Sequence, residues 1–290
     1  MTDPIVASSA DLPGSVAAAL AAPEAGQRLV IEAADIPFSV LAWGDPAARP
    51  LVLLHGVTAS AAIWWRVAPA LAATGRRVLA PDLPGHGRTG HWSGRHRFAD
   101  MAQDVAAWIR EAGVDRPDLQ VIGHSYGAVV GAHLPAAGIH PATLVLLDPP
   151  SLPHSLMARQ VEDTTERAYD DLDEAIAAVT VSEPTWSAGD VRAKAEALTE
   201  IDEAAARAVL LDNGDWDAGL SGLADPAAAN LDIWVVKGEQ ATGSYLPDAA
   251  LPAFVARLGA DHILTIKDGA HSPQRMLPEA TVVAFLRALD

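Results

Sequence analysis

Short apolar runs alternate along this chain with segments whose apolar residues recur every three or four positions. The run Leu-Val-Leu-Leu at residues 51–54 is typical of a strand buried on both faces of a parallel sheet. Residues 98–112 show the second pattern, which places their large apolar side chains on one face of a helix. The strands predicted in this way are 28–33, 38–43, 51–54, 77–80, 119–122, 144–147, 233–236 and 262–266. The helices predicted around them are 61–73, 98–112, 125–138, 248–258 and 279–289.

This alternation predicts an α/β fold with a doubly wound, mostly parallel sheet of eight strands. Residues 151–230 interrupt it, because they contain no comparable apolar run and are rich in alanine, aspartate and glutamate. We therefore expect a core made of residues 1–150 and 231–290, and a helical cap made of residues 151–230. The cap should lie over the carboxyl edge of the sheet, where open α/β sheets bind ligands. Residues 1–26 are expected to be a loosely packed N-terminal extension with one short helix near 15–22.

Composition narrows the possible partners. The chain has 290 residues, half of them hydrophobic, and a net charge of −17, which argues against binding to nucleic acid or to anionic membranes. It has no cysteine, and its histidines show no clustering, so neither a metal nor another cofactor is expected. No apolar run reaches the ~18 residues that a membrane span requires, and no signal peptide is visible, so a cytoplasmic protein is expected. The sequence leaves the oligomeric state open, and a homo-oligomer is compatible with it.

The segment Gly123-His124-Ser125-Tyr126-Gly127 carries the candidate chemistry. It joins a predicted strand to a predicted helix, and this placement of Gly-x-Ser-x-Gly is the sequence form of a nucleophile elbow. Larger residues at the two glycine positions would collide with the neighbouring strand and helix in so tight a turn. The turn would hold the Ser125 hydroxyl above the sheet, beside a helix N-terminus that favours negative charge.

Three further segments occur in the order found in one fold family. They are Leu-His-Gly-Val at 54–57, Asp-Leu-Pro-Gly-His-Gly-Arg-Thr at 82–89, and Asp-Gly-Ala-His at 268–271. Together with the serine motif they resemble the α/β-hydrolase fold superfamily, over residues 28–290. The resemblance implies a serine-nucleophile hydrolase with a helical cap, similar to esterases and lactonases. Serine at position 125 argues against epoxide hydrolases and haloalkane dehalogenases, whose nucleophile is aspartate.

The catalytic roles follow from the chemistry of acyl transfer. Ser125 needs a base to remove its proton, and a neutral imidazole suits that role at neutral pH. His271 is the chosen base, because it follows the last predicted strand on a glycine-containing loop that can turn back to Ser125. The resemblance implies that the backbone N–H groups of Val57 and Tyr126 form the oxyanion hole.

The acid of the triad departs from the commoner family pattern. That pattern places an aspartate shortly after the strand at 233–236, where this chain has Lys-Gly-Glu-Gln-Ala at 237–241. Asp148, which ends the preceding strand, is the favoured acid, Glu239 is the alternative, and Asp248 is a more distant third.

Four tryptophans are candidates for the substrate pocket. Trp64 and Trp65 follow the predicted oxyanion loop, and Trp186 and Trp216 belong to the predicted cap. The alternative for each is ordinary core packing.

We therefore expect a serine hydrolase with the triad Ser125, His271 and Asp148, cleaving a small, largely apolar carboxylic ester or lactone through an acyl-enzyme. A carbon–carbon bond hydrolase, an amidase or a perhydrolase could use the same triad. The alternative from another class is a non-catalytic ligand-binding protein of this fold.

Overall fold

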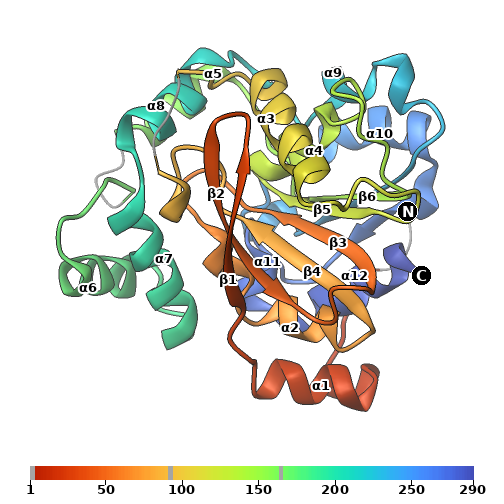
Figure 1. Ribbon diagram of the computed structural model, residues 1–290, viewed down its shortest axis with the longest axis horizontal. Coiled ribbons are helices and arrows are strands. Elements are labelled where there is room, and N and C mark those ends of the chain that lie inside the picture. The colour runs from red at the N-terminus through yellow and green to blue at the C-terminus, as the bar shows by residue number, and fades with distance from the viewer. Residues whose placement is uncertain (1–3, 91–93, 163–165) are drawn as a thin grey trace.

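An eight-stranded sheet forms the centre of the molecule (Figure 1). The computed structural model describes residues 4–90, 94–162 and 166–290. The sheet strands, in chain order, are β1 (Gln27–Ala33), β2 (Ile36–Trp43), β3 (Arg49–Leu54), β4 (Arg76–Pro81), β5 (Gln120–His124), β6 (Thr143–Leu147), β9 (Asp232–Lys237) and β10 (Ile263–Thr265). They lie side by side in the order β1-β2-β4-β3-β5-β6-β9-β10. The predicted mostly parallel, eight-stranded sheet is confirmed.

Strand β2 runs in the direction opposite to the other strands of this sheet, since it pairs antiparallel with both β1 and β4. From β4 to β10 all neighbouring strands are parallel. The carboxyl ends of β3, β5, β6, β9 and β10 therefore meet at one edge of the sheet, where the loops after them can share a site.

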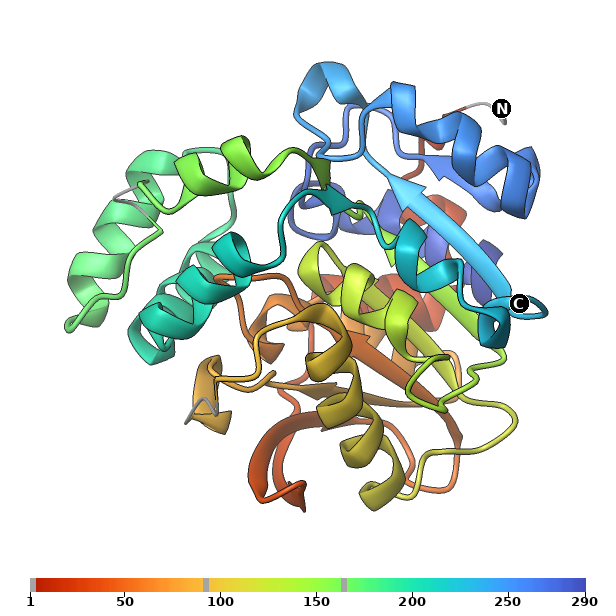
Figure 2. The same ribbon diagram turned by 90° about the horizontal axis from the view of Figure 1, so that it is seen from above.

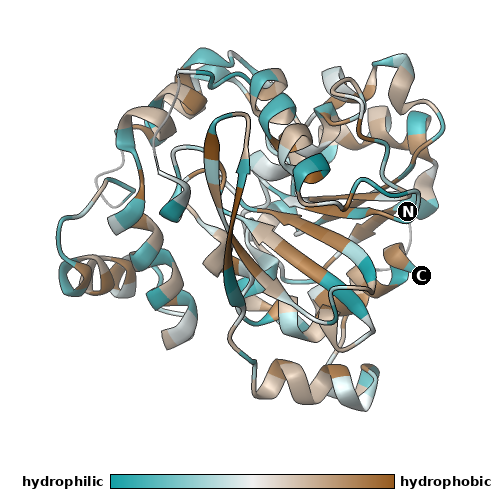
Figure 3. Cartoon of the chain, in the orientation of Figure 1, coloured by the Kyte–Doolittle hydropathy of each residue, from teal (hydrophilic) through white to brown (hydrophobic). Residues whose placement is uncertain are grey.

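Helices cover both faces of the sheet. The helices of the sheet layer are α1 (Gly14–Ala21), α2 (Val67–Ala72), α3 (Phe98–Glu111), α4 (Tyr126–His133), α10 (Leu251–Leu258), α11 (Pro273–Met276) and α12 (Pro278–Leu289). Residues of α3, α4 and α10 pack into one hydrophobic core, and residues of α1, α2 and α12 pack into a second core on the opposite face. Figure 3 shows the apolar central strands between these two layers. Their runs of apolar residues are buried on both faces, as a doubly wound sheet requires.

Short 3-10 helices connect several of these elements. They are η1 (Ser9–Asp11), η2 (Ala61–Trp64), η3 (Gly87–Thr89), η4 (Pro226–Ala228), η5 (Gln240–Thr242), η6 (Asp248–Ala250) and η7 (Ala260–His262). The single helix predicted at 61–73 is therefore wrong in one respect, because it is divided into η2 and α2.

The N-terminal extension, from residue 4 onward, is packed against the core. The short helix predicted near 15–22 is confirmed as α1. The prediction that the extension packs loosely is wrong. Leu12, Val16 and Leu20 are buried in the same core as α2 and α12. Ile5 also forms a parallel bridge with Ile266, beyond the end of β10. Leucine and valine four residues apart give α1 the apolar stripe that this burial needs.

Four helices of the predicted cap form a separate layer beside the sheet, as Figure 2 shows from above. They are α5 (His154–Gln160), α6 (Leu172–Ser182), α7 (Ala188–Glu200) and α8 (Glu203–Asp212). Helix α9 (Leu220–Leu223) lies apart from them and packs on α4 in the sheet layer, so this layer ends before the predicted boundary at residue 230. Helices α6 and α7 enclose a small apolar cluster of their own, which includes Val179 and Leu198. A two-stranded antiparallel pair, β7 (Ser151–Leu152) with β8 (Trp216–Asp217), joins the start of this layer to its end. The sequence did not predict this pair, because two-residue strands leave no pattern.

Among the described residues, none of the helices has the length and the apolar character to span a membrane.

Candidate active site

Ser125 lies directly after β5, at the start of α4, in a strained turn. Its φ is 54° and its ψ is −119°, a left-handed conformation that residues with a Cβ rarely adopt. A Cβ on Gly123 would lie 2.2 Å from the Gly127 carbonyl oxygen, and a Cβ on Gly127 would lie 2.5 Å from the Leu54 carbonyl oxygen. Both contacts are with backbone atoms, which cannot turn aside. The two glycines are therefore required by the close approach of strand and helix that forms the turn.

Replacing Gly127 with alanine is expected to lower the free energy of unfolding by about 3 kcal/mol or more, since the new methyl group would overlap backbone of the β3 loop. Denaturant unfolding followed by circular dichroism would measure the change. Gly14→Ala is the matched control, because nothing lies within 4 Å of a Cβ built on Gly14. Equal stability of both variants would contradict the steric role of Gly127.

Three predicted residues meet at the carboxyl edge of the sheet. The Ser125 Oγ lies 2.9 Å from the His271 Nε2, and the His271 Nδ1 lies 2.7 Å from the Asp148 Oδ2. An ionised carboxylate only accepts hydrogen bonds, so the proton on this imidazole belongs on Nδ1. The Nε2 lone pair then faces the serine hydroxyl, which is the arrangement that a general base requires. The ring of Tyr245 stacks on the His271 ring with centroids 4.0 Å apart.

Asp148 is fully buried and accepts hydrogen bonds on both oxygens. Its Oδ1 accepts from the Gly238 N–H at 3.1 Å and from the Ser244 hydroxyl at 2.5 Å. Its Oδ2 accepts from the Tyr245 N–H at 2.9 Å in addition to His271. These donors replace the hydrogen bonds to water that the carboxylate loses on burial. Sequence reasoning missed Gly238, Ser244 and Tyr245, because backbone donors and a single hydroxyl form no motif.

The two other candidates for the acid bind partners other than His271. Glu239 accepts a hydrogen bond from the Asp268 N–H at 3.0 Å, at one end of the loop that carries His271. Asp248 accepts from the Lys237 ammonium group at 2.6 Å. The structure thus brings Asp148, rather than Glu239 or Asp248, to His271.

Within the described part of the chain, the N–H groups of Val57 and Tyr126 have no hydrogen-bond acceptor. Tyr126 is the first residue of α4, and the first N–H groups of a helix have no partner within it. Val57 lies in the loop after β3 and lines the same cavity as Ser125. The positive end of the α4 dipole favours negative charge at this point.

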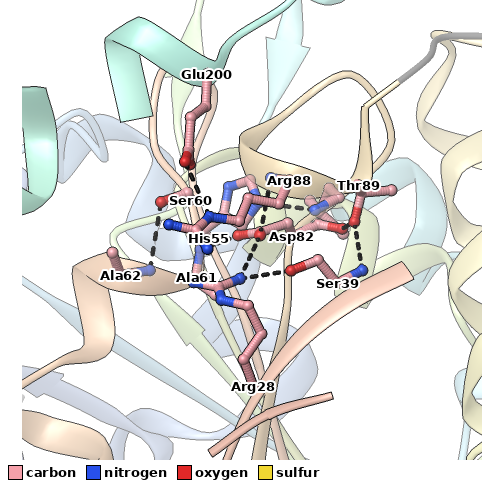
Figure 4. A network of polar contacts seen from close by, with 11 residues as sticks. Arg28, Ser39, His55, Ser60, Ala61, Ala62, Asp82, Arg88, Thr89 and Glu200 are labelled. Atoms are coloured by element: carbon pink, nitrogen blue, oxygen red, sulfur yellow. Dashed lines mark hydrogen bonds and ion pairs between the residues drawn. The ribbon is translucent and has the colours of Figure 1, made fainter. Parts of the chain in front are cut away.

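Polar side chains fix the loop that carries Val57 (Figure 4). The His55 Nε2 accepts a hydrogen bond from the Leu83 N–H at 2.9 Å, and its Nδ1 donates to the Gly56 carbonyl at 2.8 Å. Burial lowers the pKa of His55 to about 4, so it stays neutral at physiological pH. The Asp82 carboxylate accepts from the Ala61 N–H at 2.7 Å and pairs with Arg28 at 3.2 Å. The segments at 54–57 and 82–89 therefore support each other.

His124, beside the nucleophile, contacts the loop of the candidate base. Its Nε2 donates to the His271 carbonyl oxygen at 2.8 Å. Burial holds the pKa of His124 well below its usual value, which keeps the ring neutral and lets it tie the β5 turn to the loop after β10.

A cavity of about 510 Å³ opens over Ser125 and His271. Trp186 and Trp216 line it, as does Met157 of α5. Trp64 and Trp65 do not, which corrects their expected place in the pocket. Trp64, the last residue of η2, is fully buried in the second hydrophobic core. The Trp65 indole instead donates to the Asp190 carboxylate of α7 at 2.9 Å.

The lining is mixed in character, which corrects the expectation of a largely apolar pocket. Glu166, Glu183, Lys194 and Arg275 all line the cavity beside its apolar residues. The Lys194 ammonium group donates to the Thr58 carbonyl oxygen at 2.9 Å and the Thr58 hydroxyl at 2.7 Å, next to Val57. Sequence reasoning missed Glu166, Glu183 and Lys194, since charged side chains on the predicted cap are usually solvated. Arg275 could have been noticed, because it lies four residues after His271.

The chain is similar to proteins of a known family. A family model described as alpha/beta hydrolase fold matches residues 49–288. The chain belongs to this family. Lipase LipV of Mycobacterium tuberculosis is 31% identical to this alpha/beta hydrolase over 269 residues, which cover 87% of the present chain and 97% of the lipase. The family and this relative support a hydrolase enzyme.

Solved structures of other alpha/beta hydrolases share the fold. The structure of E-2-(acetamidomethylene)succinate hydrolase matches with a TM-score of 0.75 at 19% identity, covering 91% of this chain and 99% of that one. The esterase RhEst1 from Rhodococcus sp. ECU1013 matches with a TM-score of 0.68 at 22% identity, covering 92% and 98%. At these identities the likeness concerns the fold alone.

Proposed function

We propose that this alpha/beta hydrolase is a serine hydrolase that cleaves a carboxylic ester or lactone through an acyl-enzyme. The chain of contacts from the Ser125 Oγ through His271 to the buried Asp148 carries the proposal. The lipase relative, similar over nearly its whole length, supports an ester as the substrate.

In the proposed mechanism, the Ser125 Oγ attacks the substrate carbonyl while its proton passes to the His271 Nε2, 2.9 Å away. Asp148 accepts the Nδ1 hydrogen bond, holds the imidazole in the productive tautomer and stabilises the imidazolium that forms. The N–H groups of Val57 and Tyr126 receive the negative charge on the carbonyl oxygen. His271 then returns its proton to the leaving alkoxide, and water removes the acyl group by the same steps in reverse order.

We further propose that the helical layer within residues 151–230, from α5 to α8, acts as a cap on this site. Residues of this segment and of the core line one cavity. Asp190 and Lys194, both on α7, bond to Trp65 and Thr58 of the core. These ties would hold the α7 side of the cap over the oxyanion loop.

A fluorophosphonate probe tests the proposed nucleophile. One equivalent of probe is expected to attach to Ser125, because the paired imidazole makes its hydroxyl nucleophilic. Peptide mass spectrometry after labelling would locate the adduct. An unlabelled protein, as expected of a non-catalytic binding protein, or an adduct on another residue would contradict the proposal.

The bond that is cleaved is tested with matched substrates. Esters, lactones, amides and carbon–carbon substrates that share one acyl group are assayed with the same enzyme preparation. Ester or lactone turnover is expected to exceed the other reactions in kcat/KM. Faster turnover of the amide or of the carbon–carbon substrate would assign the triad to that reaction instead.

A further inference from the structure

Arg275 is a buried cation in the wall of the candidate active-site cavity. It belongs to α11, which follows directly after the loop of His271, and it lines the cavity together with Ser125 and His271. The residue is only 4% exposed. A guanidinium carries five N–H donors, and removing it from water is costly unless those donors and the charge find partners.

The partners of Arg275 within the described residues satisfy a small part of this need. Its Nη1 donates to the Asp190 carbonyl oxygen at 2.8 Å, and its guanidinium carbon lies 4.3 Å from the centre of the Trp186 ring. Its Nε is buried and has no acceptor. No carboxylate of the described chain lies within ion-pair distance of it, although the cavity wall contains three glutamates, Glu166, Glu183 and Glu203.

Lys194, the second buried cation of this wall, differs in this respect. Its three ammonium hydrogens are matched by three acceptors: the Thr58 carbonyl oxygen, the Thr58 hydroxyl and the Glu166 carboxylate. Glu166 is thereby engaged with Lys194. Two more arginines of the wall, Arg167 and Arg207, are exposed to solvent, so Arg275 is the buried cation of this wall with donors to spare among the described residues.

Arg275 is charged at neutral pH. Burial lowers its pKa to about 10, while Asp190, Glu166 and Glu183 oppose that decrease from a distance. Of the other wall carboxylates, Glu183 has a raised pKa, because burial and the neighbouring Glu166 disfavour its charged form. The cavity therefore presents a positive charge without a directly bonded counter-ion.

We propose that Arg275 binds an anionic group of the substrate, so that the enzyme acts on esters or lactones that bear a free carboxylate. This proposal rests on the proposed serine hydrolase function and names its substrate class. A carboxylate could accept two parallel hydrogen bonds from a guanidinium, which gives both affinity and orientation. Trp186 would hold the guanidinium plane in position beneath the bound group.

The test compares substrates that differ only at the far end of the acyl chain. They are the monomethyl esters of succinic, glutaric and adipic acid, each matched with the methyl ester whose free carboxylate is replaced by a carboxamide. Hydrolysis is followed by pH-stat. Wild-type enzyme is expected to prefer the best carboxylate ester over its carboxamide by about 10- to 100-fold in kcat/KM, as a charged hydrogen bond allows.

Arg275→Gln is expected to bring this ratio close to one, and Arg275→Lys to restore part of it. Arg66→Gln is the matched control, since Arg66 also lies beside Asp190 but does not line the cavity, and it is expected to keep the wild-type ratio. A wild-type ratio near one, or an Arg275→Gln variant that slows both esters equally, would overturn the proposal.

A measurement on the wild-type protein covers the case in which Arg275→Gln does not fold. Free glutarate is expected to inhibit hydrolysis of a neutral ester competitively, and glutaramide at the same concentration is not. Equal inhibition by both would overturn the proposal. Failure of the proposed function has a different signature, namely that no ester of either series is hydrolysed in a manner that depends on Ser125.

Discussion

Replacing Ser125 with alanine is expected to lower kcat by about 10⁴-fold to 10⁶-fold. The methyl group has no lone pair with which to attack a carbonyl. The turn itself should persist, because its geometry is set by Gly123 and Gly127 and by the Ser125 N–H bond to the Leu147 carbonyl. Steady-state hydrolysis of the best ester would measure the loss.

The control for this experiment is thermal unfolding of the same variant. A Tm close to that of the wild-type protein would assign the lost activity to chemistry rather than to misfolding. Residual activity within ten-fold of wild type would exclude Ser125 as the nucleophile.

Asp148→Asn is expected to lower kcat by about 10⁴-fold. The two oxygens of Asp148 each accept a backbone N–H, from Gly238 on Oδ1 and from Tyr245 on Oδ2. Either orientation of an asparagine amide would therefore direct its NH₂ group at another N–H. The amide also carries no negative charge to stabilise the imidazolium of His271. The kcat for ester hydrolysis is the quantity to measure.

Glu239→Gln is the matched comparison for Asp148→Asn. Glu239 bonds to the Asp268 N–H, and glutamine can keep that bond through its amide oxygen. Its kcat is expected to stay within about three-fold of wild type, since exposed polar substitutions usually have small effects. If Glu239→Gln lost more activity than Asp148→Asn, the role of the acid would pass to Glu239.

Much of the fold could be predicted from the sequence, because the strands of a doubly wound sheet are unbroken apolar runs. Residues 51–54 and 144–147 show this directly, and both are sheet strands. The N-terminal helix was harder to assess. The alanines of α1 are apolar too, so the contrast in hydropathy between its two faces is weak. The burial of Val16 and Leu20 follows from their contacts in the second hydrophobic core, which the sequence alone does not show.

The candidate site, like the fold, could be predicted where the signal is local in the sequence. Ser125 and His271 lie in local motifs, so a single sequence can identify them as candidates. The partners of Asp148 and the environment of Arg275 depend on contacts between segments far apart in the chain, such as Asp148 with Ser244 and Arg275 with Asp190. Sequence spacing carries no information about such contacts, and the mixed lining of the cavity follows from them.

The antiparallel pair of β7 and β8 has a consequence for how this enzyme can diverge. Ser151 pairs with Asp217 and Leu152 with Trp216, so the chain leaves the sheet layer and returns to it at neighbouring points. The conformational entropy of closing the intervening segment depends only weakly on its length. Insertions, deletions and substitutions between these two strands can therefore change which molecules the cavity admits, while the elements that hold Ser125, Asp148 and His271 keep their positions.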